Sequence, residues 1–152
     1  MKFLSDDKEK LERLRGIVES WVNTPYQHWC GVKGEGCDCI HFVARSLEEM
    51  GYGPFTIPWY SKDWNLHNGA EVLLDGIREQ LPHVEFDIEF SLDMPIDADI
   101  VLFRFGKVNS HAGIFFDGHV YQALNKARVE RRHWKDKVWY KRRTKILRVL
   151  AL

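Results

Sequence analysis

Apolar residues recur at helical spacing in the first part of the chain. In residues 6–22 they stand three and four positions apart, and Ser5 can cap this stretch. A second stretch with the same spacing runs from Cys39 to about Met50, preceded by Asp38 as a possible cap. Each stretch has one apolar face, so we predict two amphipathic helices that pack on a common core.

The spacing changes in the last third of the chain. A short helix is predicted over 70–81, and residues 51–68 are predicted to be irregular because they are rich in Gly, Pro and aromatic residues. Short branched and aromatic segments, separated by turn residues, then follow at 99–105, 111–116, 119–124 and 127–132. Together with the end of the chain they predict an antiparallel sheet of about five to six strands, and therefore an α+β fold.

Length and composition favour one folded domain covering residues 1–152. Hydrophobic residues make up 45% of the chain and aromatic residues 13%, which excludes an intrinsically disordered protein. No apolar run approaches the roughly 20 residues of a membrane span, so we expect none. The first ten residues lack the apolar core of a signal peptide, so we expect no export by that route.

The formal net charge is zero, but the charges are unevenly distributed. Residues 126–152 hold 11 of the 22 basic residues and only two acidic ones, so the rest of the chain is acidic. We interpret the basic stretch as the exposed face of terminal strands, outside the chemistry proposed below. Contact with an anionic polymer is an alternative. Nucleic acid is not expected as a partner, because the stretch has no recognisable nucleic-acid motif.

The three cysteines all lie between Cys30 and Cys39. Three is too few for a disulfide scaffold, and their spacing matches no standard zinc pattern, so we expect no metal. Cys39 stands at a predicted helix start after a Gly-rich loop. Free backbone N–H groups and the helix dipole stabilise a thiolate there, which predicts a lowered pKa and makes Cys39 a candidate nucleophile. A structural cysteine is the alternative, and the position of Cys39 alone does not exclude it.

A nucleophilic cysteine needs a histidine as its base, and a third group that orients the histidine. His111 is attractive because it is predicted to open a strand after a turn at 108–110. Gln122 lies eleven residues later and could stand beside His111 across a hairpin. Spacing alone leaves the choice among seven histidines open. They are His28, His41, His67, His83, His111, His119 and His133.

Two blocks of the sequence resemble a known family. The first is TPYQHW…GEGCDCIHFV (24–43), and the second is DADIVLFRF followed by SHAGIFFDGHVYQAL (97–124). In this order they resemble the NlpC family of papain-like cysteine peptidases, and most of all its phage-encoded branch. The resemblance implies a papain-like fold, with N-terminal helices packed on an antiparallel sheet, and hydrolysis of an amide bond without a cofactor.

The resemblance assigns roles to individual residues. It implies that Cys39 is the nucleophile, His111 the general base and then acid, and Gln122 the orienting residue. It also implies that the Tyr26 hydroxyl and the Cys39 backbone N–H donate to the oxyanion. His41 stands where the family commonly has glycine. We expect His41, Trp59 and Trp64 to be candidates for the wall of the substrate groove.

The implied substrate is a peptide or a peptidoglycan fragment, cleaved in the stem peptide. Two alternatives remain: a phage tail or assembly protein that keeps the fold without turnover, and a thiol amidase or acyltransferase acting on another substrate. Phage tail proteins are therefore possible partners. The expected location is the bacterial cytoplasm or a phage particle, with action at the cell wall.

Overall fold

The computed structural model describes residues 3–62, 71–80, 84–85 and 95–152. Its helices are η1 (Leu4–Asp6, a 3-10 helix), α1 (Lys8–Ser20), α2 (Cys39–Glu49), α4 (Val72–Gln80) and α5 (Lys137–Tyr140). Its strands are β1 (Gly31–Val32), β2 (Gly36–Cys37), β3 (Val84–Glu85), β4 (Ile100–Phe105), β5 (Val108–Phe116), β6 (His119–Ala123), β7 (Val129–His133) and β8 (Arg143–Val149).

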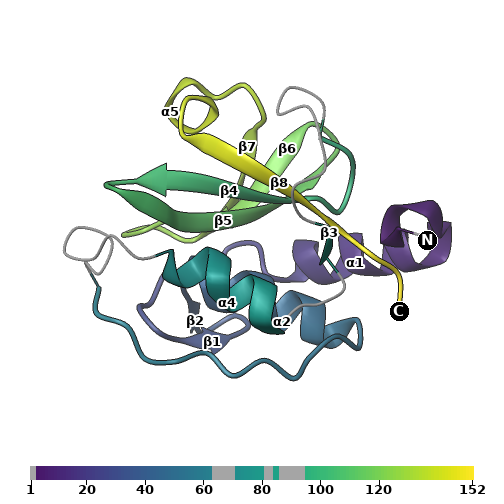
Figure 1. The fold of residues 1–152 in the computed structure, drawn as a ribbon, viewed down its shortest axis with the longest axis horizontal. Coiled ribbons are helices and arrows are strands. Elements are labelled where there is room, and N and C mark those ends of the chain that lie inside the picture. The colour runs from purple at the N-terminus through teal and green to yellow at the C-terminus, as the bar shows by residue number, and fades with distance from the viewer. Residues whose placement is uncertain (1–2, 63–70, 81–83, 86–94) are drawn as a thin grey trace.

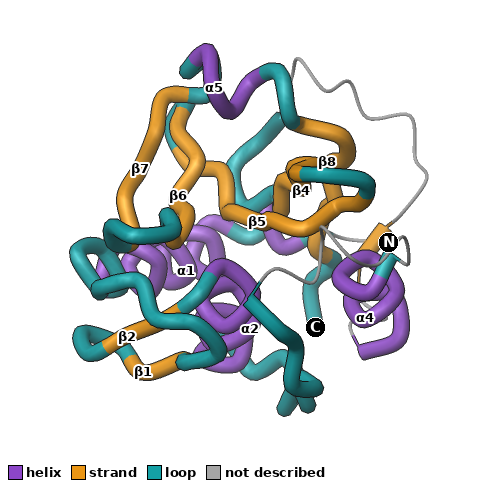
Figure 2. The backbone as a smooth tube through the Cα atoms, turned by 90° about the vertical axis from the view of Figure 1, so that its left-hand side faces the viewer, coloured by secondary structure: helices purple, strands orange, loops and turns teal. Residues whose placement is uncertain are grey.

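Six strands form one antiparallel sheet, and α1, α2 and α4 lie on one side of it (Figure 1). The strand order is β3-β8-β4-β5-β6-β7, so the chain runs as a meander from β4 to β7 and then returns to place β8 on the other side of β4. Figure 2 shows α1 and α2 below the sheet, the β1–β2 hairpin beside α2, and α5 on the far side of the sheet. The α+β architecture predicted from the sequence is confirmed.

The predicted helices are present, with one correction at a helix start. α1 begins after Asp7, whose carboxylate accepts hydrogen bonds from the backbone N–H groups of Glu9 and Lys10. The prediction that Ser5 caps this helix is wrong, because residues 4–6 form the separate turn η1. An aspartate two residues later supplies the acceptor and also suits the positive end of the helix dipole.

The strand that carries His111 begins earlier than predicted. β5 starts at Val108, and the reversal from β4 is made at Gly106, whose φ of 72° lies in the left-handed region that glycine adopts easily. The predicted turn at 108–110 is therefore part of the strand. His111 pairs with Phe103 of β4 and lies within the strand, where its backbone is fixed by the sheet.

The sheet has an apolar cluster on each face. The cluster on the helix side includes Phe42, Leu47, Ile100, Ile114 and Leu147. The smaller cluster on the opposite face is built from Val101, Phe103, Phe115, Val120 and Trp134, with Trp139 of α5 packed against it. Successive strand residues point to opposite faces, so β4 and β5 contribute to both clusters and read as nearly continuous apolar runs.

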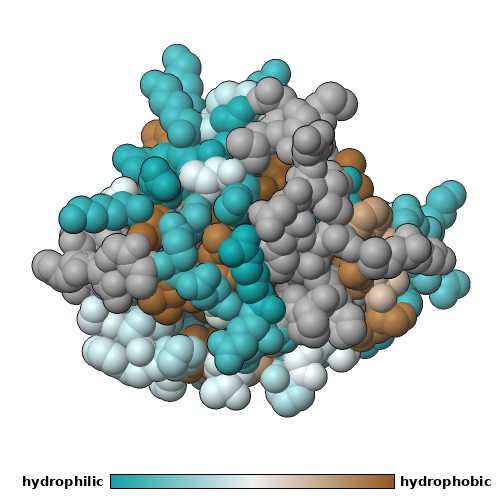
Figure 3. Space-filling model, viewed as in Figure 1, coloured by the Kyte–Doolittle hydropathy of each residue, from teal (hydrophilic) through white to brown (hydrophobic). Residues whose placement is uncertain are grey.

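The basic C-terminal stretch includes α5, an element that the sequence analysis did not predict. Its apolar residues Ile146, Leu147 and Val149 are buried and most of its basic side chains are exposed, as expected for terminal strand surface. Figure 3 shows hydrophilic side chains projecting at the α5 end of the molecule. None of the helices in the described ranges is long and apolar enough to cross a membrane.

Candidate active site

Cys39 is the first residue of α2, and Asp38 is the N-cap. The Asp38 carboxylate accepts hydrogen bonds from the backbone N–H groups of His41 and Trp29, both at 2.8 Å. The backbone N–H of Asp38 in turn donates to the carbonyl of Cys30, at 3.1 Å. Asp38 therefore binds the preceding loop through both its side chain and its backbone N–H, and these bonds fix the orientation of the adjacent Cys39 thiol.

The sulfur of Cys39 lies against strand β5. Its Sγ is 3.9 Å from the carbonyl oxygen of Ser110, the residue before His111. The backbone N–H of Ala112, the residue after His111, also interacts with the thiol. The helix start and the strand thus bring Cys39 to the two backbone positions that flank the predicted base.

The predicted lowering of the Cys39 pKa is wrong. Burial raises the pKa of the Cys39 thiol to about 12, and the negative charge of Asp38 adds to the rise. The N–H groups at the helix start and of Ala112 act in the opposite direction but do not outweigh burial. A helix start can be identified in a sequence, but the burial of its first side chain depends on packing against β5.

His111 and Gln122 meet across the β5–β6 hairpin, as the eleven-residue spacing predicted. The imidazole Nε2 of His111 lies 2.7 Å from the amide Oε1 of Gln122. An amide oxygen only accepts, so Nε2 carries the proton and Nδ1 is the nitrogen that can take one up. Gln122 is fully buried, so solvent does not compete for its oxygen.

Gly113 makes this close approach of β6 to β5 possible. A Cβ atom on Gly113 would stand 2.5 Å from a methyl carbon of Val120 and 2.8 Å from the carbonyl oxygen of Tyr121. Both neighbours belong to β6, so any side chain at this position would push the strand outward. Gln122 would move with it and lose its bond to His111.

Aromatic rings surround the imidazole of His111. The ring of Trp139 lies 4.9 Å from it, centre to centre, and those of Phe103 and Phe105 lie 5.6 and 5.9 Å away. Burial lowers the pKa of His111 to about 4, and the hydrogen bond to Gln122 only partly offsets this. His111 is therefore neutral at pH 7.

Trp139 also corrects the interpretation of the basic stretch. It belongs to α5, within the segment that was expected to lie outside the proposed chemistry, yet it packs on the imidazole. Arg142 stacks on Phe105, with its guanidinium carbon 4.3 Å from the ring centre. The middle of the basic stretch therefore forms part of the surroundings of His111.

Tyr26 lies next to the cysteine loop. Its backbone forms a bridge with Cys37, and its N–H donates to the carbonyl of Ala127, which ties the segment to the sheet side. Burial raises the pKa of the Tyr26 hydroxyl, and the charge of a Cys39 thiolate contributes to the rise. The hydroxyl therefore stays protonated and can donate a hydrogen bond near the sulfur.

His41 lies inside the helix start. It is 4% exposed, its Nδ1 is 2.8 Å from the Asp38 carboxylate, and its ring packs under Gly31 of β1. A Cβ on Gly31 would stand 3.0 Å from two carbons of His41, so the hairpin covers this ring closely. His41 thus supports the Asp38 side chain instead of extending into a groove.

Tyr60 binds Asp38, a contact that the sequence did not indicate. Its hydroxyl donates to the Asp38 carboxylate, opposite the bonds from His41. Burial raises the pKa of Asp38, but the bonds from His41 and Tyr60 outweigh it and hold that pKa below its ordinary value. Tyr60 lies in a segment without a hydrophobic period, so the sequence pattern gave no reason to place it against the N-cap of α2.

The remaining candidates lie elsewhere. Trp59 is 70% exposed and contacts His28 at 6.5 Å, centre to centre. Trp64 lies outside the described residues.

All three cysteines are free thiols. Within the described ranges, no three side chains of the His, Cys, Asp and Glu types are placed to hold a metal ion.

Comparisons with known proteins identify the family and the fold. A model of the NlpC/P60 family matches residues 23–148. No curated protein matches the chain. Among solved structures, the fold is similar to a protein from Staphylococcus aureus subsp. aureus Mu50 described as similar to a lipoprotein of the NLP/P60 family. The TM-score is 0.65 at 15% identity, with 100% of this chain and 44% of that chain covered.

Two further structures share the fold. NlpC1 from Trichomonas vaginalis has a TM-score of 0.59 at 15% identity, and 92% of this chain and 43% of that chain are covered. The NlpC/p60 domain of the peptidoglycan hydrolase SagA has a TM-score of 0.54 at 14% identity, with 92% and 98% covered. The chain thus spans less than half the length of the first two structures and nearly all of the SagA domain. The family match covers more than half of the sequence and includes the Cys39 and His111 blocks, so the chain belongs to the NlpC/P60 family.

Proposed function

We propose that the protein is a cysteine peptidase or amidase that hydrolyses an amide bond in peptidoglycan stem peptides. The observation that carries the proposal is the placement of Cys39 against β5 beside His111, whose imidazole is held by Gln122. Family membership and the fold shared with a peptidoglycan hydrolase domain support the choice of substrate.

In the first half of the reaction, Nδ1 of His111 takes the proton of the Cys39 thiol as the sulfur attacks the amide carbon. The carbonyl oxygen becomes an oxyanion, to which the Tyr26 hydroxyl and the Cys39 backbone N–H donate. Removing one such donor typically costs 10²–10³-fold in rate. The imidazolium then returns its proton to the leaving amine, the C–N bond breaks, and a thioester to Cys39 remains.

In the second half, His111 takes a proton from water, and the hydroxide attacks the thioester carbon. The C–S bond breaks, the carboxylic acid leaves, and the proton returns to the sulfur. Gln122 accepts from Nε2 throughout, which keeps the imidazole oriented with Nδ1 toward the reaction. Because burial disfavours both charged forms, thiol and imidazole are neutral at rest and become charged only during turnover.

The test is release of soluble peptides and free amines from purified cell wall. Cys39→Ala should lose release by at least ~10⁴-fold, as expected for loss of a nucleophile. Cys30→Ala is the matched control, because Cys30 is also a free thiol, lies before α2 and has no role in the steps above. Release that persists in Cys39→Ala, or that is absent from the wild type across cell walls of different peptide composition, would contradict the proposal.

A further inference from the structure

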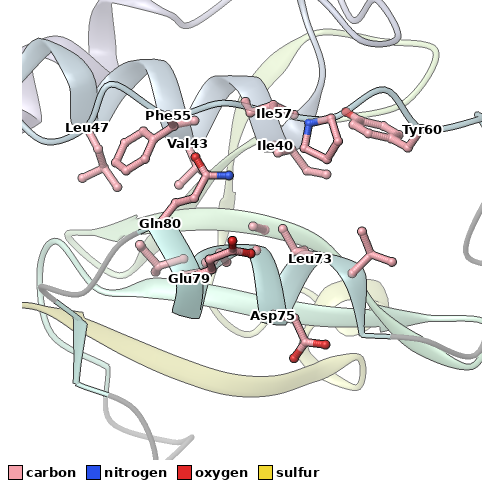
Figure 4. A pocket seen from close by; sticks show the side chains of 17 residues that line it. Ile40, Val43, Leu47, Phe55, Ile57, Tyr60, Leu73, Asp75, Glu79 and Gln80 are labelled. Carbon is pink, nitrogen blue, oxygen red and sulfur yellow. The ribbon is translucent and has the colours of Figure 1, made fainter.

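A cavity of about 400 Å³ lies between α2, α4 and the irregular segment 55–60. Figure 4 shows side chains from these three elements converging on it. Its walls are mostly apolar, and the principal apolar side chains are Ile40, Val43 and Leu47 of α2, Leu73 and Ile77 of α4, and Phe55. The volume lies within the range that binds small organic ligands.

One end of this cavity reaches the surroundings of the Cys39 sulfur. Ile40 follows Cys39 directly, and Ala112 provides the backbone N–H that interacts with the thiol. Tyr60, whose hydroxyl binds Asp38, lines the cavity at the same end. The cavity is therefore lined by residues that adjoin or contact the Cys39 region.

The polar groups of the cavity belong to one side of it. Asp75 and Glu79 of α4 and the amide of Gln80 are among the lining residues, and Figure 4 shows the Asp75 carboxylate pointing away from α2. No basic side chain lines the cavity among the described residues. The described lining offers an anionic group no cation, and its charged side chains belong to α4 alone, so the apolar surface of α2 and Phe55 suits an apolar occupant.

We propose that this cavity binds an aliphatic or other large apolar substituent of the substrate, adjacent to the scissile amide. This inference rests on the proposed function only in taking Cys39 as the reactive atom. It narrows the substrate class to amides that carry an apolar group of several carbons beside the carbonyl. Polar stem-peptide residues alone would leave the apolar walls in contact with water.

Two helical glycines offer a matched pair of variants. Gly76 of α4 lines the cavity, and a Cβ placed on it meets nothing within 4 Å. Gly16 of α1 is exposed, and a Cβ on it also meets nothing within 4 Å. Gly76→Leu therefore adds a side chain at the cavity, whereas Gly16→Leu adds the same side chain to the surface. Both changes replace a residue that is unfavourable within helices.

The experiment measures alkylation of Cys39 by iodoacetamide and by N-hexyl iodoacetamide, using intact mass and peptide mapping. Alkylation needs no turnover, so its outcome is separate from that of the proposed hydrolysis. Each buried methylene favours binding about fourfold. After the cost of ordering the chain, the hexyl reagent should react with the wild type on the order of tenfold faster at low concentration.

Gly76→Leu should abolish this preference and leave the rate with iodoacetamide unchanged, and Gly16→Leu should behave as the wild type. Equal rates for the two reagents in the wild type would overturn the inference, and so would a preference that survives in Gly76→Leu. A chain-length preference in a protein that releases nothing from cell wall would retain this inference while contradicting the proposed substrate.

Discussion

Cys39 and His111 belong to two regions that hold their side chains in different ways. The Cys39 region is polar: the Asp38 carboxylate gathers bonds from Trp29, His41 and Tyr60 around a helix start. The His111 region is aromatic, with a single strong polar contact to Gln122. The first region fixes position through directed hydrogen bonds, and the second does so through packing.

Both regions nevertheless have the same effect on charge. The buried thiol beside a carboxylate disfavours the thiolate, and the buried imidazole between rings disfavours the imidazolium. The two regions differ in the contacts that shift each pKa. Burial is the larger cause at both residues, but at Cys39 the negative charge of Asp38 adds to it, whereas at His111 the surroundings are mainly apolar rings, so substitutions should affect the two regions differently.

The largest expected effect is on the polar region. Asp38→Ala leaves the N–H groups of Trp29 and His41 without their acceptor inside the protein, and should lower the free energy of unfolding by about 3 kcal/mol. Asp7→Ala is the matched control, because Asp7 caps α1 without such a network and should cost about 1 kcal/mol. Urea unfolding measures both, and equal losses would show that the Asp38 network adds nothing beyond a cap.

The aromatic region should make stability depend on pH. The folded pKa of His111 is about 4 and the unfolded value is about 6.5, so the unfolded chain binds the proton first as pH falls. The contribution is fully present above pH 6.5 and is lost between pH 6.5 and 4, by about 3 kcal/mol. His111→Asn should lack this component in urea unfolding measured at several pH values. Identical pH dependence of the two proteins would contradict it.

Removing one of the aromatic rings around His111 should change the pKa of its imidazole. Trp139→Ala exposes one face of the imidazole, and the pKa of His111 should rise from about 4 toward its ordinary value. An NMR titration of the imidazole protons measures this. Trp59→Ala is the control, since Trp59 is exposed and contacts His28 instead. A His111 pKa that stays near 4 in Trp139→Ala would place the cause of the low value elsewhere.

The smallest effect is expected from basic residues remote from both regions. Arg131 and Arg132 lie on β7, whereas Arg142 stacks on Phe105 beside His111. Arg131→Ser with Arg132→Ser should leave hydrolysis of a small soluble substrate within about twofold of the wild type. Arg142→Ser should reduce the rate of this hydrolysis more than the double substitution does. If the double substitution on β7 reduces the rate more, the residues that influence His111 extend beyond those that contact it.

The sequence predicted the elements and the cross-strand pair because both depend on local spacing. The helix from Cys39 is confirmed, and the eleven residues between His111 and Gln122 place them together across one hairpin. The contact of Tyr60 with Asp38 and that of Trp139 with His111 were not predictable. Each contact joins an irregular or short segment to an element far away in the sequence, and hydrophobic periodicity does not predict such contacts.

The prediction of a lowered Cys39 pKa failed for the same reason, because it used local sequence features alone. Its position at the helix start is a local feature, but its burial against Ser110 and Ala112 requires the fold. Likewise, the beginning of β5 at Val108 depends on pairing with β4, which a turn-like triplet does not reveal. The phage-encoded branch and the cellular location stay predictions.

The most direct test of the account is to trap the acyl-enzyme. Purified protein is quenched in acid during turnover of a peptide substrate, and the intact mass and the modified peptide are then determined. The account predicts an added acyl mass on Cys39 that hydroxylamine removes, that accumulates further in Gln122→Ala, and that is absent from Cys39→Ala. Substrate turnover with no Cys39 adduct in any of these proteins, or an adduct on another residue, would contradict it.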